Sequence, residues 1–291
     1  VWWESIMTGN DLLRDRMALA LSEIFVISHE SDLFDFTEGF ADYYQVLYDQ
    51  SFGNFRDLLY DVTMHPTMGS YLSHLNNPKA DPTENRFPDE NYAREIMQLF
   101  TIGLNELNND GTAKLDIGGN TIPTYTNQDI KELAKVFTGT CGVGTDSMCI
   151  WYGDYSYYFG KHSRAYKWEE PMIVFEEHHD TGSKKLPDGT IIPAGQTGLQ
   201  DINDALDYLF NHPNVGPFIS YRLIQQLVKS NPTPEYIARV ATVFNSNENG
   251  DRGNLGSVIK AIFLDEEARS CESINDGYHG KMREPLLRST Q

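Results

Sequence analysis

The chain has 291 residues, of which 40% are hydrophobic and 22% charged, and its formal net charge at pH 7 is −19. This composition is typical of a soluble globular protein, and 12% aromatic residues supply too much core material for a disordered chain. The negative charge argues against a nucleic-acid partner, because such a surface repels phosphate backbones.

No run of 18 apolar residues occurs, so the sequence predicts no membrane span. The first residues, VWWESIMTGNDLL, read like the inside of a domain, and the last, GKMREPLLRSTQ, break off as a helical pattern begins. We therefore expect a fragment of a longer or processed chain.

Apolar residues recur at helical spacing along most of the chain. Helices are predicted, in chain order, over residues 10–28, 40–52, 54–65, 66–75, 88–103, 126–139, 199–213, 217–232, 233–245 and 254–269. Local chemistry marks several of their ends. Thr126 is a predicted N-cap with Asp129 three residues on, and Gly139 is the stop. Thr233 caps another helix, with Pro234 in its first turn.

Strand signals are few and local. Asp110-Gly111 and Gly118-Gly119 provide turns for a small hairpin over residues 104–126, and Asp188-Gly189 does so near residue 188. Residues 139–198 form a long, irregular, aromatic-rich insertion, and insertions of that length tend to be functional. The prediction is a mainly α fold, a single multi-helix domain over residues 1–291 with small β-hairpin insertions.

Two of the three cysteines, Cys141 and Cys149, flank a short loop. They form a local disulfide in an oxidising compartment or remain free thiols, and the sequence leaves both alternatives open. Their spacing is not a zinc pattern, and Cys271 has no evident partner.

Several long motifs resemble the bacterial family catalogued as domain of unknown function 1800. They include NFRDLLYDVTMHPTMGSYLSHLNNPKADP, RFPDENYAREIMQLFTIGLNELNNDGT, YTNQDIKELAKVFTG and LFNHPNVGPFISYRLIQQLVKSNPTPEYIARVATVFN. The resemblance runs from about Trp2 to Leu287. It implies an exported, mostly helical bacterial protein, periplasmic or extracellular, often encoded beside a sulfatase-like exported partner. No settled reaction comes with it.

The motif ENYAREIMQLF supplies the first candidate site. On a helix, one polar face gathers Asn91, Arg94, Glu95 and Gln98, while Ile96, Leu99, Phe100 and Gly103 face the core. Glu95 is the candidate general acid or base, assisted by Arg94, with Asn91 as a substrate contact. The alternative is a structural ion pair or polar network.

The motif FEEHHDTGSKK supplies the second candidate site. In an extended chain, Glu177 and His179 share one side, and His178 and Asp180 lie on the other. The family resemblance favours His179 as the catalytic partner, with Asp180 and Lys184 beside it. The alternative is a solvated polar loop.

The third candidate is the aromatic run between residues 151 and 168, whose rings suit a sugar polymer. Its candidate substrate-binding residues are Trp151, Tyr155, Tyr158 and Trp168. The alternative is that these rings pack the insertion onto the helices.

The fourth is the loop NSNENGDRGN, which mimics part of an EF-hand but has Gly256 where the bidentate glutamate belongs. Its candidate ligands for Ca²⁺ or another divalent metal are Asn245, Asn247, Asn249 and Asp251. The alternative is a capped turn between helices.

Two functions remain open. The first is an exported hydrolase or lyase acting on an extracellular polymer such as a polysaccharide, with Glu95, His179 and Arg94 in one cleft. The second is a non-catalytic binding or assembly protein of the envelope, stabilised by calcium. No P-loop, Gly-x-Ser-x-Gly or His-Glu-x-x-His motif occurs.

Overall fold

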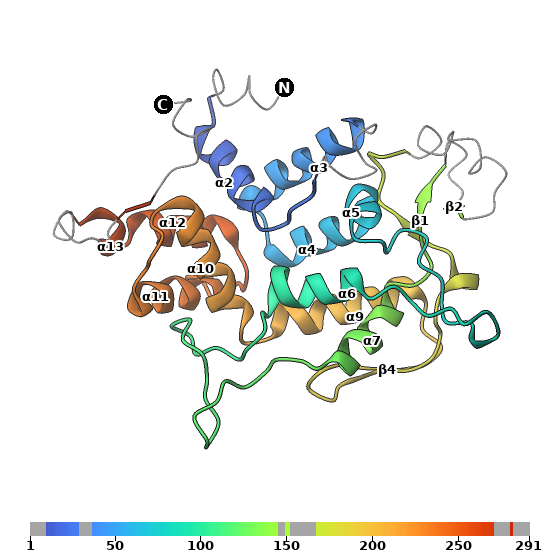
Figure 1. Cartoon of the computed structure of the whole chain (residues 1–291). Helices are drawn as coiled ribbons and strands as arrows, with labels where there is room; N and C mark the ends of the chain where they lie inside the picture. The colour runs from blue at the N-terminus through green and yellow to red at the C-terminus, as the bar shows by residue number, and fades with distance from the viewer. Residues whose placement is uncertain (1–9, 29–36, 145–148, 152–166, 271–279, 282–291) are drawn as a thin grey trace.

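Figure 1 shows the computed structural model, which describes residues 10–28, 37–144, 149–151, 167–270 and 280–281. Helices dominate, and the strands are short, so the predicted mainly α fold with small β insertions is confirmed. No helix in these ranges is long and apolar enough to cross a membrane.

The N-terminal half begins with helices that pack on one another. Their bounds are α2 Leu12–Ser22, α3 Thr37–Asp49 with the 3₁₀ turn Gln50–Phe52, α4 Phe55–Met64 and α5 Pro66–Tyr71. Asn54 caps α4 by accepting a hydrogen bond from the Arg56 amide at 2.9 Å. Arg56 in turn binds Asp207 at 2.6 Å and so ties α4 to a helix far along the chain.

The helix predicted over residues 88–103 is present but changes type midway. α6 covers Asn91–Glu95, and a π-helical segment follows over Ile96–Thr101. A π-turn holds more residues than an α-turn, so side chains beyond it rotate around the axis. Leu99, expected to face the core, is therefore 36% exposed.

The insertion is more regular than its sequence indicates. After α7 (Asn127–Val136), strand β1 (Thr140–Val143) pairs antiparallel with both β2 (Cys149–Ile150) and β3 (Ile173–Val174). Cys141 and Cys149 form a disulfide between β1 and β2, which resolves the two alternatives. A second hairpin pairs β4 (Lys184–Lys185) with β5 (Ile191–Ile192), and Gly189 takes the left-handed conformation its turn needs, at φ 92°.

The remaining helices follow the predicted boundaries closely. They are α9 Gly198–Asn211, α10 Val215–Leu227, α11 Pro234–Asn245, α12 Leu255–Leu264 and α13 Glu266–Arg269. Figure 1 shows α10 to α13 gathered on one side of the molecule and the strands on the opposite side, with α9 running behind α6 between them. Thr233 and Pro234 begin α11 as predicted.

One hydrophobic cluster runs through the helices from Met17 to Ile262. Fully buried members such as Phe55 and Leu206 each stabilise the fold by about 1.5–3 kcal/mol relative to an exposed side chain. The predicted hairpin over residues 104–126 carries only isolated bridges, such as Leu107 to Ala113, and projects from this core (Figure 1).

Candidate functional site

The predicted site residues His179 and Lys184 lie in a buried cluster with Asp201. Their side chains are at most 1% exposed. His179 Nε2 lies 3.0 Å from Asp201 Oδ2, and Lys184 Nζ contacts the same oxygen. Lys184 also donates to the Asp180 and Gly182 carbonyls. The cluster holds β4 against the start of α9 and is closed to substrate.

The local backbone explains why only one of the two histidines is buried. Glu176–His178 form a 3₁₀ turn, so the expected extended chain is wrong at this place. The turn leaves His178 outside, where its ring stacks on Trp151 at 4.1 Å between centroids. His179 follows the turn and points inward, where Nδ1 lies 2.8 Å from the Thr138 carbonyl oxygen.

The polar face of α6 forms a separate cluster. Arg94 pairs with Glu90, one turn earlier, at 3.3 Å. Glu95 and Arg94 both act on the Tyr125 hydroxyl, whose pKa is raised mainly by burial. Glu95 Oε2 is closed off from solvent and has no hydrogen-bond partner among the described residues. Asn91 lies exposed at the start of the helix.

Glu95 and His179 do not share a cleft. α7 packs against both α6 and β4, and Figure 1 shows it between them. Among the described residues, every polar contact of the His179 ring is made by Thr138 or Asp201. A catalytic set made of Glu95, Arg94 and His179 therefore does not fit this geometry.

The aromatic candidates divide into two kinds. Trp168 is 4% exposed and packs over Gly39, where an added Cβ would lie 2.9 Å from its ring, so it belongs to the core. Trp151 is half-buried and forms a small aromatic group with Phe175 and His178. Tyr155 and Tyr158 lie outside the described residues.

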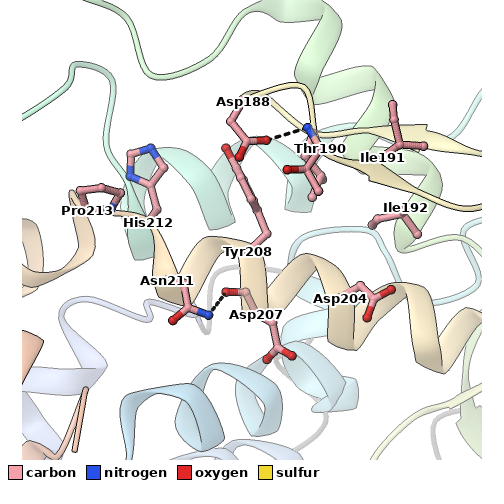
Figure 2. A pocket seen from close by; sticks show the side chains of 11 residues that line it. Asp188, Thr190, Ile191, Ile192, Asp204, Asp207, Tyr208, Asn211, His212 and Pro213 are labelled. Atoms are coloured by element: carbon pink, nitrogen blue, oxygen red, sulfur yellow. Dashed lines mark hydrogen bonds between the residues drawn. The ribbon is translucent and has the colours of Figure 1, made fainter. Parts of the chain in front are cut away.

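The structure opens a groove at another place, between the β4–β5 hairpin and the C-terminal half of α9 (Figure 2). We call this cavity the hairpin groove. It holds about 510 Å³ and is lined by residues of Leu186–Ile192 and Asp204–Pro213. Three of the lining side chains are aspartates, Asp188, Asp204 and Asp207, and none is Lys or Arg.

Two neutral side chains, Tyr208 and His212, complete the lining of the hairpin groove, and the Tyr208 hydroxyl oxygen is itself closed off from solvent. Burial raises the pKa of Tyr208 to about 12, and the charge of Asp188 adds to the effect, so the phenol keeps its proton. Burial also lowers the pKa of His212, so its ring is neutral at pH 7. His212 Nδ1 accepts the Asn214 amide at 3.1 Å, which leaves the proton on Nε2. Figure 2 shows Tyr208 pointing towards Asp188.

A second cavity of about 530 Å³ adjoins this groove. Thr126, Asp129 and Glu132 of the α7 end line it together with Lys185 of β4, and Ile191 is shared by both cavities. The tip of the hairpin therefore has a cavity on each side. A chain-like ligand that crosses Ile191 would contact both.

A family model described as "Protein of unknown function (DUF1800)" matches residues 1–291. The chain belongs to this family. The resemblance found in the motifs is thus confirmed over the whole length. No curated protein and no solved structure matches the chain.

The loop of this DUF1800 chain expected to bind Ca²⁺ is occupied by the protein's own donors. Asn245 Oδ1 accepts the Arg252 guanidinium at 2.5 Å, so a cation already lies on that oxygen. Asn247 Oδ1 accepts the amides of Asn249 and Asp251, both at 2.9 Å. The loop is a capped turn between α11 and α12, as the alternative predicted. Among the described residues, no group of three His, Cys, Asp or Glu could hold a metal.

The sequence of this DUF1800 chain contains a signal for the groove that its motifs did not single out. Asp204, Tyr208 and His212 are spaced four apart in a predicted helix, so they share one face. Asp188 was predicted only as a turn residue. Nothing in the sequence indicates that this turn lies opposite that face of α9.

Proposed function

We propose that this DUF1800 chain is an exported protein that binds a hydroxyl-rich polymer, such as a polysaccharide, in the hairpin groove. The observation that carries the proposal is the lining of the groove, where Asp188 and Asp204 supply carboxylates, His212 supplies a neutral donor, and Asp207 is already paired with Arg56. Carboxylates accept hydrogen bonds from hydroxyl groups, and the Nε2–H group of His212 donates to an ether or hydroxyl oxygen.

The apolar part of the groove supports the same ligand. Ile191 is 54% exposed between the two cavities, and Pro213 and the Tyr208 ring add flat carbon surface. Sugar rings present CH faces that pack on such surfaces while their hydroxyls reach polar tips. A mostly apolar lining with a few polar groups is typical of clefts that bind small molecules and polymers.

The disulfide supports an exported location, periplasmic or extracellular. Cys141 and Cys149 join strands at the edge of the insertion. Disulfides persist in oxidising compartments and are rare in the reducing cytosol.

The proposal is tested by binding to soluble β-glucan, xylan, chitosan and polygalacturonate. Asp188→Asn keeps the acceptor for the Thr190 amide, now 2.8 Å away, but loses the charge. We expect about a tenfold weaker Kd for the polymer that binds, because one charge-assisted hydrogen bond contributes about 1.5–3 kcal/mol.

The matched control is Glu248→Gln, which removes one exposed carboxylate in the turn after α11. It changes the net charge by the same amount and should leave Kd unchanged. Equal losses in both variants would mean that overall charge, and not the groove, governs binding. The absence of binding to all four polymers would contradict the proposal.

Cleavage of the polymer, by a hydrolase or lyase activity, is the second candidate. It is favoured by Glu95, whose Oε2 is buried without a partner in the described part of the chain. Such a carboxylate is available to move a proton. Tyr125 beside it precedes Thr126, which lines the second cavity.

We expect Glu95→Gln to abolish release of reducing ends or unsaturated products by at least about a hundredfold, the usual contribution of a general acid or base. Glu90→Gln, which removes the carboxylate paired with Arg94 and leaves Glu95 and Arg94 in place, is the control. Full activity in Glu95→Gln would exclude this residue from catalysis.

A further inference from the structure

The buried cluster that joins β4 to the first turn of α9 has chemistry that binding does not use. Lys184, Asp201 and His179 are at most 1% exposed, and they come from three separate places in the fold. Asp201 Oδ2 contacts both other side chains, whereas Asp201 Oδ1 is buried and has no partner among the described residues. A buried carboxylate with one unpaired oxygen is costly.

The hydrogen-bond partners of the His179 ring indicate which of its two nitrogens carries a proton. His179 Nδ1 faces the Thr138 carbonyl at 2.8 Å, and a carbonyl only accepts, so Nδ1 carries a proton. A neutral ring then has its lone pair on Nε2, which lies 3.0 Å from Asp201 Oδ2. That contact is favourable when Oδ2 itself carries a proton.

Lys184 completes this arrangement. Its Nζ has three acceptors around it, the carbonyls of Asp180 and Gly182 and the Asp201 carboxyl group. An ammonium would leave either a lone-pair clash at His179 or a net positive charge inside the fold. An uncharged amine donates its two hydrogens to the two carbonyls and directs its lone pair at Asp201, which satisfies every hydrogen-bonding group in the contact.

We propose that Lys184 and Asp201 condense to form an isopeptide bond. The Lys184 Nζ lone pair attacks Cγ of the protonated Asp201 carboxyl group, and the Cγ–Oδ2 bond breaks. Oδ2 leaves as water, with its own hydrogen and one hydrogen from Nζ. His179 Nε2 takes the proton from the amine and delivers it to Oδ2. No oxidant, reductant or cofactor is needed.

The product fits the site better than the separate groups. The bond removes both ionisable groups from the interior, and the unpartnered Oδ1 becomes a neutral amide oxygen. It also joins β4 to the first turn of α9, the two elements that carry the walls of the hairpin groove. The groove would then be held by a covalent link that reduction cannot open.

The test is the intact mass of the denatured, reduced wild-type chain. We expect it to be lower by one water than the mass of the sequence, and the Lys184→Arg variant to have the full mass. The exposed neighbour is the control: Lys185→Arg keeps the water loss. A wild-type chain of full mass would overturn the proposal.

Peptide mapping shows which residues of the chain have lost the water. Trypsin should not cleave after Lys184 in the unfolded wild type, and one branched peptide should contain both Lys184 and Asp201. A water loss that persists in Lys184→Arg would indicate a succinimide at an Asp-Gly pair such as Asp188-Gly189 and would also overturn the proposal. In His179→Gln the full-mass chain should accumulate and convert slowly, and an unchanged rate would remove the role given to the ring.

Discussion

At the scale of single residues, His74 shows how burial controls charge. It is 1% exposed, stacks on Tyr92 at 3.9 Å between centroids, and donates from Nε2 to the Thr63 carbonyl at 2.8 Å. Burial lowers its pKa from 6.5 to about 4. His74 is therefore neutral in the folded chain over the whole physiological range.

The sign of the pH dependence follows from that shift. Between pH 6.5 and 4 the unfolded chain binds the proton and the folded chain does not, so His74 destabilises the fold as the pH falls. The full loss is about 3 kcal/mol in the free energy of unfolding. Urea titrations at pH 7 and pH 5 should show about 2 kcal/mol of this loss, because the folded-state pKa of about 4 lies below that interval. His74→Gln, which cannot titrate, should show a smaller drop between these pH values, and an equal drop would contradict the assignment.

The sequence indicates which residues are chemically notable, but it does not indicate which residues they contact in the fold. His179 was expected to face a pocket as a catalytic residue but is completely buried, and its partners Thr138 and Asp201 lie 41 and 22 residues away. Trp168 was expected as a ligand platform and is a core residue, because Gly39 gives its ring a place to pack. Contacts across such separations depend on the fold, and one sequence does not contain them.

At the scale of elements, helix ends follow from local chemistry. Thr126 caps α7 as predicted, with its backbone amide donating to Asp129 Oδ2 at 2.7 Å. The π-helical segment after Glu95 was not predicted. A hydrogen bond from the Thr101 hydroxyl to the Ile96 carbonyl spans five residues there, and hydrophobic periodicity does not reveal it.

Substitution of Thr126 tests how much the N-cap of α7 contributes to the stability of the fold. Thr126→Ala removes the side-chain oxygen of the capping box and should lower the free energy of unfolding by about 1 kcal/mol. Thr126→Ser keeps the oxygen and should lose only a few tenths of that. Equilibrium urea unfolding compares the two, and an equally stable Thr126→Ala would show that the cap is dispensable.

At the scale of the whole molecule, the hairpin groove joins parts of the chain that were interpreted separately. The helix over residues 199–213 and the turn at Asp188-Gly189 were both predicted, but not their meeting. The tie from Arg56 to Asp207 and the buried Lys184–Asp201 contact fix α9 and the hairpin in place. Preorganised walls of this kind lower the cost of binding.

A hydroxyl-rich polymer bound in this groove would shield the backbone amides of its walls from solvent. Hydrogen exchange of the whole chain, with and without the tightest-binding of the four polymers, tests it most directly. We expect slower exchange in Leu186–Ile192 and in the C-terminal half of α9, and no change in α11 and α12. Protection confined to other segments, with these two unchanged, would contradict it.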